Sequence, residues 1–174
     1  MRRPHDQVRD VGRVRRIVET RASFERALAL REAILGHASE EVASSLEDLA
    51  RLDATERHPA AALAGFREAL AIRTKVEGAD YFNNAGALRG IGEALCELGR
   101  AREAVPPLRT AVALLARYAG DPVALGAARF SLAVAIWDAG GDRAEARALA
   151  AGALADDRQL RARIQAWQRT HGQR

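Results

Sequence analysis

Apolar residues recur every three or four positions along most of the chain, which is the spacing of one face of an α-helix. Glycines at positions 36, 78 and 120 follow three of these stretches, where a helix end needs a positive φ angle. Ser39, Asp80 and Asp121 come shortly after them and are N-cap candidates. The pattern predicts helices over residues 9–35, 40–55, 59–77, 81–98, 101–119, 122–139, 142–155 and 157–170.

The same pattern repeats along the chain at a shift of 42 residues. Residues 24–31 and 66–73 are identical at five of eight positions under this shift. The shift also relates the three glycines to one another and aligns several apolar positions. A fixed period of this length is the signature of stacked helical repeats. The aligned apolar sets are Leu46, Leu88 and Phe130; Phe66, Leu108 and Ala150; and Ala62, Ala104 and Ala146.

The middle unit carries a family resemblance. Its small and large apolar residues have the spacing of the tetratricopeptide repeat (TPR), and the 42-residue period resembles the kinesin-light-chain-like class. The resemblance implies an all-α, right-handed solenoid of about 3.5 helix-turn-helix repeats with a C-terminal capping helix. The phrases at 26–32 and 68–73 are also similar to TPR tails of bacterial multidomain regulators, where such arrays follow a kinase or ATPase domain. The residues that match the TPR signature are Leu88, Ile91, Gly92, Leu95, Ala104, Leu108 and Ala111.

The register divides the chain into three parts. Residues 1–16 form a basic leader, and residues 17–155 form the TPR array. Residues 156–174 form a closing helix and basic tail, with Trp167 expected to dock that helix. Within the array we expect a half repeat at 20–38 and repeats at 39–79, 80–120 and 121–155.

Three local features depart from the pattern or leave a choice open. Asp53 stands where the signature has a large apolar residue. Pro106 and Pro107 fall inside a predicted helix, where proline removes a donor and clashes with the preceding turn. We therefore expect that helix to be kinked or to start late. Asn83 and Asn84 begin another helix, and they serve either the helix start or an amide contact to a bound peptide backbone.

Composition agrees with a helical fold and limits the function classes. Alanine, the best helix former, occurs 39 times, against four Phe, two Trp and two Tyr. The single cysteine, Cys96, excludes an internal disulfide and a cysteine-rich zinc site. No apolar leader is visible, so we expect a cytoplasmic protein.

Charge argues against a nucleic-acid groove. The net charge is +4, but residues 1–31 and 158–174 each carry +5, whereas residues 32–157 carry −6. A nucleic-acid groove requires the opposite distribution. Binding of nucleic acid by the Arg-rich ends is the weakest of the functional hypotheses.

Enzymatic signatures are absent from the sequence. There is no Walker A motif, no His-Glu-x-x-His and no Cys-x-x-Cys, and the four histidines are not spaced as paired ligands on one helix. We therefore expect no catalytic residue, no metal and no cofactor.

The TPR resemblance implies that a partner binds the concave face lined by the first helix of each repeat. The positions expected to line this groove contain more acids than arginines, which favours a basic or mixed-charge protein or peptide. The leading hypothesis is a non-catalytic protein–protein interaction module. The groove residues are Ser44, Glu47, Asp48, Arg51, Arg89, Glu93, Glu97, Ser131, Ala135 and Asp138.

The N-terminal half repeat supplies the alternative function. Its helix lacks the preceding partner that covers the equivalent helix in other repeats, and terminal repeats need a polar cap. Either the leader lengthens this helix as a cap, or the uncovered face self-associates. In the second case the chain is an oligomerisation or regulatory tail of a bacterial kinase or ATPase signalling protein, with no membrane partner.

Overall fold

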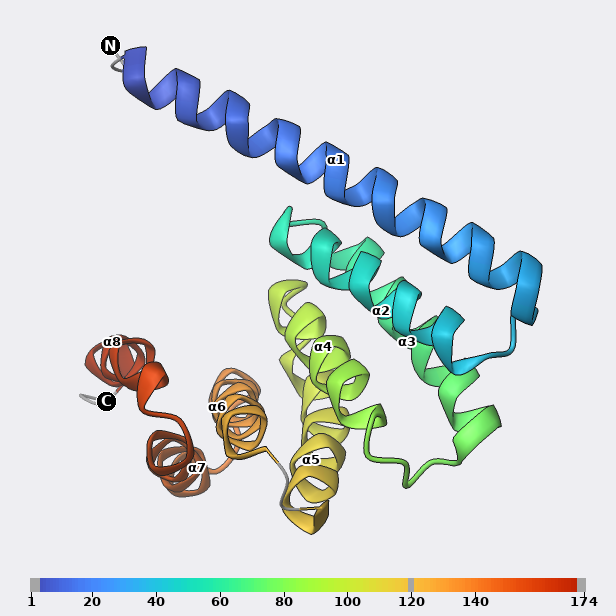
Figure 1. The fold of residues 1–174 in the computed structure, drawn as a ribbon. Coiled ribbons are helices and arrows are strands. Elements are labelled where there is room, and N and C mark those ends of the chain that lie inside the picture. Colours follow the sequence, from blue (N-terminus) through green and yellow to red (C-terminus); the bar gives the residue numbers. More distant parts are fainter. Residues whose placement is uncertain (1–3, 119–120, 172–174) are drawn as a thin grey trace.

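The computed structural model describes residues 4–118 and 121–171, with side chains from residue 17 onward except that of residue 158. All regular structure in these ranges is helical (Figure 1). The elements are α1 (Pro4–Leu35), α2 (Glu40–Thr55), α3 (Pro59–Glu77), α4 (Asn84–Glu97), α5 (Ala101–Tyr118), α6 (Pro122–Asp138), α7 (Arg143–Asp156), the 3-10 turn η1 (Arg158–Leu160) and α8 (Arg161–His171).

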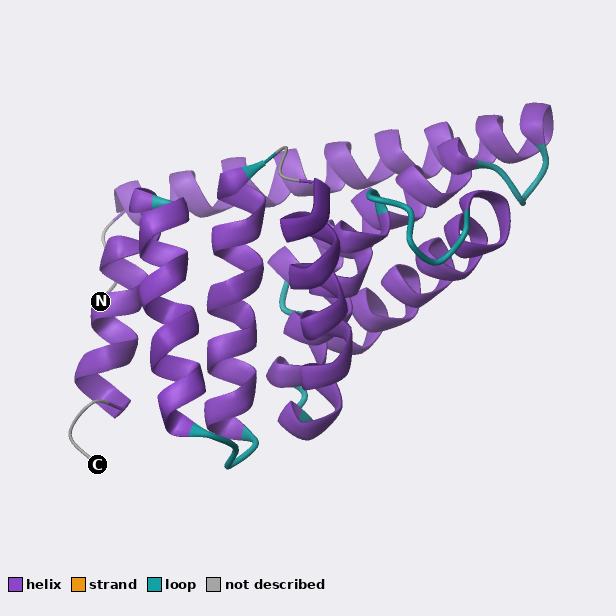
Figure 2. Cartoon of the chain, turned by 90° about the horizontal axis from the view of Figure 1, so that it is seen from below, coloured by secondary structure: helices purple, strands orange, loops and turns teal. Residues whose placement is uncertain are grey.

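The helices stack in chain order. The pairs α2–α3, α4–α5 and α6–α7 each pack internally, and each pair packs against the next (Figure 1). Figure 2 shows short loops joining neighbouring helices along the array. The predicted all-α solenoid is confirmed, with α8 packed at the C-terminal end. The long helix α1 packs against α2 and runs as one continuous element from Pro4, so residues 4–16 extend it.

Small residues at repeated positions let the helices approach closely. Ala62, Ala104 and Ala146 are fully buried, and so are Ala69, Ala111 and Ala153. An added Cβ at Gly90 lies 2.5 Å from the Phe66 ring, and one at Gly92 overlaps the Leu108 side chain. These glycines are therefore required for packing between helices, not for backbone freedom.

Helix ends follow the predicted chemistry at most positions. Gly36 and Gly78 have φ angles of 77° and 95°, as a left-handed helix end requires, whereas Gly120 lies outside the described residues. The side chain of Ser39 accepts a hydrogen bond from Val42 N, and Asp121 accepts one from Ala124 N. Both N-cap predictions are confirmed.

The start of α4 differs from the prediction. The helix begins at Asn84 rather than at residue 81, and Asp80 is not its N-cap. Asn84 is fully buried, and its Nδ2 donates to the carbonyls of Gly78 and Ala79 at 2.9 and 3.0 Å. Its amide therefore organises the preceding turn, which is the helix-start interpretation. Asn83 is exposed and donates to the Tyr81 hydroxyl at 3.1 Å.

Helix α5 includes both prolines and begins at Ala101. Of the two outcomes expected for it, a kink or a late start, the late start is therefore wrong. The helix loses the backbone donors of Pro106 and Pro107, whose N–H groups would bond to residues 102 and 103. Position 106 is exposed, and positions 104 and 108 on the same helix are fully buried. Packing of that buried face offsets the two missing hydrogen bonds.

Asp53 stands where the TPR signature has a large apolar residue. The structure gives it a partner that the sequence pattern did not reveal. Arg21 of α1 donates to Asp53 Oδ1 at 2.6 Å and also bonds Glu56. The hydrogen bonds to these two carboxylates raise the pKa of Arg21. A polar clamp thus replaces the apolar contact expected at this position, and it ties α1 to α2.

Candidate functional site

Three adjoining pockets follow the first helices α2, α4 and α6. A pocket of about 250 Å³ lies between α2 and α4, and a second of about 380 Å³ lies between α4 and α6. They share Arg89, Glu93 and Glu97. A third pocket of about 340 Å³ adjoins the first and shares Glu47 and Arg51 with it. Together these pockets form a groove across three repeats, and we call it the first-helix groove.

Glu93 lies near the middle of this groove and is held from both sides. Arg89 donates to Glu93 Oε1 at 2.8 Å, and Ser131 of α6 donates to the same oxygen at 2.7 Å. Glu97, one turn further along α4, lies 3.6 Å from Arg57. Hydrogen bonds and ion pairs of this kind fix the positions of the charged groups that a partner would meet.

Glu47 lies below the surface rather than projecting from it. It is only 6% exposed, and its Oε2 accepts a hydrogen bond from Arg73 Nη1 at 2.9 Å. Arg73 is 2% exposed and also donates from Nε to both oxygens of Glu40 and from Nη1 to the Asn83 carbonyl. This cluster of the buried residues Glu47 and Arg73 with the partly exposed Glu40 joins α2, α3 and the start of α4.

The remaining predicted residues are divided between the groove and other places. Ser44 and Arg51 line it, whereas Asp48 is absent from its lining and pairs with Arg51 at 3.1 Å. Ala135 is fully buried in the core. Asp138 lies in a separate depression beside the α4–α5 turn.

The groove also contains residues that the sequence did not predict there, among them two aromatic side chains and an arginine. Phe66 lies in the first pocket, and Phe130 and Arg163 line the second. The Arg163 guanidinium carbon is 5.5 Å from the centre of the Phe130 ring, a cation–π arrangement. Arg163 belongs to α8, which lies outside the 42-residue register, so no repeat pattern could have placed it.

Cys96 lines the second pocket and is the only thiol of the chain. Burial, followed by the negative charges of Asp138 and Glu93, raises its pKa from 9.0 to about 11. Because the thiolate is the nucleophile, a thiol with this pKa is unreactive at neutral pH.

One group of side chains within the described ranges has the geometry of metal ligands. Ligand atoms of Asp53, Glu56 and His58 lie within 4.8 Å of one another. Arg21 already donates to both carboxylates, so its positive charge occupies the position that a cation would take. The group is therefore accounted for by the clamp that joins α1 to α2.

The comparisons with known proteins agree with this geometry. Residues 42–80 match the family model described as tetratricopeptide repeat. The chain has the fold of a TPR solenoid, and proteins built from such repeats generally bind other proteins. No curated protein sequence matches the chain. None of the described helices combines the length and apolar character that a membrane span requires.

Two solved structures show which TPR solenoids the fold resembles. The crystal structure of BtubC (BKLC) from P. vanneervenii matches with a TM-score of 0.71 and 22% identity, covering 86% of this chain and 58% of that one. A putative kinesin light chain with nearly identical TPR-like repeats from Podosopora anserina matches with a TM-score of 0.60 and 22% identity, covering 84% and 68%. The chain thus spans less than two thirds of the first of these proteins.

Proposed function

We propose that the chain is a non-catalytic protein–protein interaction module that binds a partner segment along the first-helix groove. The observation that carries this proposal is the continuity of the three pockets, because two neighbouring pairs of them share lining residues. A continuous groove across three repeats suits an extended or helical peptide.

The charges along the groove favour a partner segment of mixed charge. Glu97 is exposed and Glu93 is partly exposed beside its partner Arg89, and both supply negative charge. Arg51 and Arg163 supply positive charge near the two ends of the groove. Glu47 contributes little because Arg73 neutralises it below the surface. Basic residues of the partner then lie over α4, where Glu93 and Glu97 are one turn apart.

The test reverses both charges on α4. In the double variant Glu93→Lys/Glu97→Lys, we expect proteins captured from a cell lysate by the wild-type chain to be retained about tenfold less, because a basic segment then meets like charges. Retention is measured by quantitative mass spectrometry of the bound fraction, and circular dichroism checks that helix content is unchanged.

A matched control reverses two charges on second helices. The double variant Glu68→Lys/Glu103→Lys changes the net charge by the same amount on α3 and α5, away from the groove. It should retain the wild-type partners. Equal retention by the α4 variant and the wild type would place the binding surface elsewhere.

We also propose that two copies of the chain associate through α1. One observation supports this proposal. Leu30 is 63% exposed, whereas its repeat equivalents Ile72 and Leu114 are 7% and 5% exposed. Ile34, one turn further along, is 76% exposed. On α3 this face is covered by α2, and on α5 it is covered by α4. The same face is therefore open on α1. Burying it against a second copy removes apolar surface from water.

Light scattering after size-exclusion chromatography tests this second proposal. The wild-type chain should show a mass that rises toward a dimer with concentration, and Leu30→Ser/Ile34→Ser should remain a monomer. A control variant, Val123→Ser, changes an exposed apolar residue on α6 and should behave as the wild type. A wild-type monomer at all concentrations would exclude the α1 interface.

The similarity to bacterial kinase tails stays a prediction.

A further inference from the structure

Both tryptophans of the chain lie together at the C-terminal end of the array. The rings of Trp137 on α6 and Trp167 on α8 are 5.3 Å apart and nearly perpendicular. The His171 ring stacks on Trp167 with centres 5.5 Å apart. Packing of Trp167 against Phe130 and Trp137 confirms that this residue docks the closing helix. His171 ends α8 and lies within this aromatic cluster.

A pocket of about 230 Å³ opens beside these rings, and we call it the tryptophan pocket. Its walls are Trp137, Arg147, Trp167, Gln168 and His171. The Arg147 guanidinium carbon lies 5.6 Å from the Trp137 ring centre. The polar groups of this lining are a guanidinium, an indole N–H, an amide and an imidazole, and none is a carboxylate. The lining therefore suits a negatively charged group.

Trp167 carries an unused donor. The side chain is 8% exposed, and no described group accepts a hydrogen bond from its buried Nε1–H. A buried polar hydrogen without an acceptor is unfavourable and is rare in folded proteins. The donor lies below the surface that a water-sized group can reach, whereas other atoms of Trp167 line the tryptophan pocket. The indole signal of this residue therefore reports on occupancy of the pocket.

The acidic residues that precede or begin α7 are committed elsewhere. Asp142 caps α7 by accepting from Ala144 N and Glu145 N. Glu145 pairs with Arg109 of α5 at 2.5 Å. Within the described part of the chain, no carboxylate pairs with Arg147. Its guanidinium is thus available to an anion from outside the chain.

We propose that the tryptophan pocket binds one carboxylate side chain, a glutamate or aspartate, of a partner protein. The pocket is too small for a folded surface or a nucleotide and large enough for one side chain. Arg147 supplies the opposite charge, and the exposed Gln168 amide supplies a hydrogen bond. This site is separate from the first-helix groove, so its occupancy is tested without reference to that groove.

The experiment follows the indole N–H signals in a proton–nitrogen correlation spectrum. The chain has two tryptophans, so two signals are expected, and a Trp137→Phe sample assigns them. The probe is a blocked pentapeptide, Gly-Ser-Glu-Ser-Gly, compared with its glutamine counterpart. The Trp167 indole signal should shift and saturate with the glutamate peptide, because the ring lines the pocket, and it should stay in place with the glutamine peptide.

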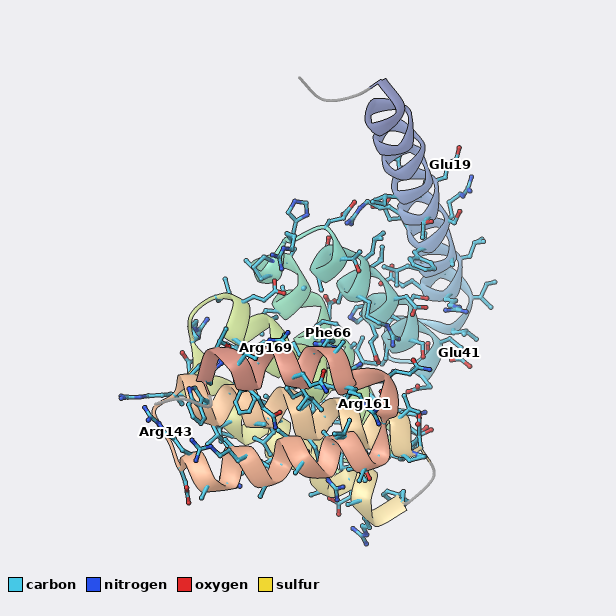
Figure 3. The ribbon with its side chains drawn as sticks, turned by 90° about the vertical axis from the view of Figure 1, so that its left-hand side faces the viewer. Glu19, Glu41, Phe66, Arg143, Arg161 and Arg169 are labelled. Atoms are coloured by element: carbon cyan, nitrogen blue, oxygen red, sulfur yellow. The ribbon has the colours of Figure 1, made fainter. Side chains whose placement is uncertain are left out.

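Variants separate the pocket from general electrostatics. Arg147→Ala should weaken binding of the glutamate peptide about tenfold, as expected on loss of a charge-assisted hydrogen bond. Gln168→Glu, which places a like charge at an exposed position of the lining, should weaken it similarly without removing core packing. The control Arg161→Ala should leave binding unchanged. In Figure 3, Arg161 lies at one end of α8 and Arg169 lies at the other end. Arg143 of α7 lies toward the same end as Arg169.

Three results would overturn the proposal. The first is an immobile Trp167 signal at millimolar glutamate peptide. The second is a Trp167 response to the glutamine peptide equal to the response to the glutamate peptide, or binding of the glutamate peptide by Arg147→Ala and Gln168→Glu as tight as by the wild type. The third is saturation by inorganic phosphate at the same concentration, because that result would indicate a general anion site rather than a carboxylate pocket.

Discussion

Replacing Arg73 by alanine is expected to lower the free energy of unfolding by about 3–5 kcal/mol, a typical cost of removing one partner from a buried ion pair. Arg73 is 2% exposed and bonds Glu40, Glu47 and the Asn83 carbonyl. Its loss leaves the Glu47 carboxylate buried without its main counter-charge. Three elements, α2, α3 and the start of α4, lose their common contact.

Urea denaturation followed by circular dichroism measures this effect. The matched control is Arg67→Ala, an exposed arginine on the same helix, for which a change within about 0.5 kcal/mol is expected. A loss of stability below about 1 kcal/mol would show that the cluster contributes little to the fold.

The contact between Gly92 and Leu108 gives the second large effect. Leu108 is fully buried, and its truncation to alanine should cost about 2–5 kcal/mol. Glycine to alanine inside a helix normally gains up to about 1 kcal/mol. At position 92, however, the added Cβ overlaps the Leu108 side chain, so Gly92→Ala should destabilise by about 1–3 kcal/mol.

A double-mutant cycle checks that the two residues act on one contact. In Gly92→Ala/Leu108→Ala, the new Cβ fills part of the space that leucine left, so the total loss should be smaller than the sum of the two single losses by more than about 0.5 kcal/mol. Gly152, where an added Cβ meets nothing closer than 3.6 Å, is the control: Gly152→Ala should be neutral or stabilising. Additive losses would disprove the steric coupling.

The 42-residue register made the fold predictable. It related residues that share a structural role, such as Ala62, Ala104 and Ala146, all fully buried as the pattern required. Helix ends were predictable wherever glycine or a capping side chain marks them. The start of α4 was not, because buried Asn84 bonds the turn before it, and a pattern of apolar residues contains no information on such a bond.

The groove was predictable only in part, because its charges are set by contacts between helices. Glu47 occupies a groove-facing register position, but it bonds Arg73 from the neighbouring helix and is buried. The repeat of arginine at positions 31 and 73 was a usable signal for such partners, since Arg31 likewise bonds α2 through Ser45 and the Glu41 carbonyl. Arg163 had no such signal, because α8 is not part of the repeat.

The two ends of the array are held by different forces. At the N-terminal end, Arg21 clamps α1 to α2 through Asp53 and Glu56. At the C-terminal end, Trp167 holds α8 against Phe130 and Trp137 by ring contacts. Added salt weakens ion pairs near the surface, whereas salting-out anions such as sulfate strengthen apolar contacts. Concentrated sulfate therefore acts in opposite senses on the two ends, loosening the first helix while tightening the last.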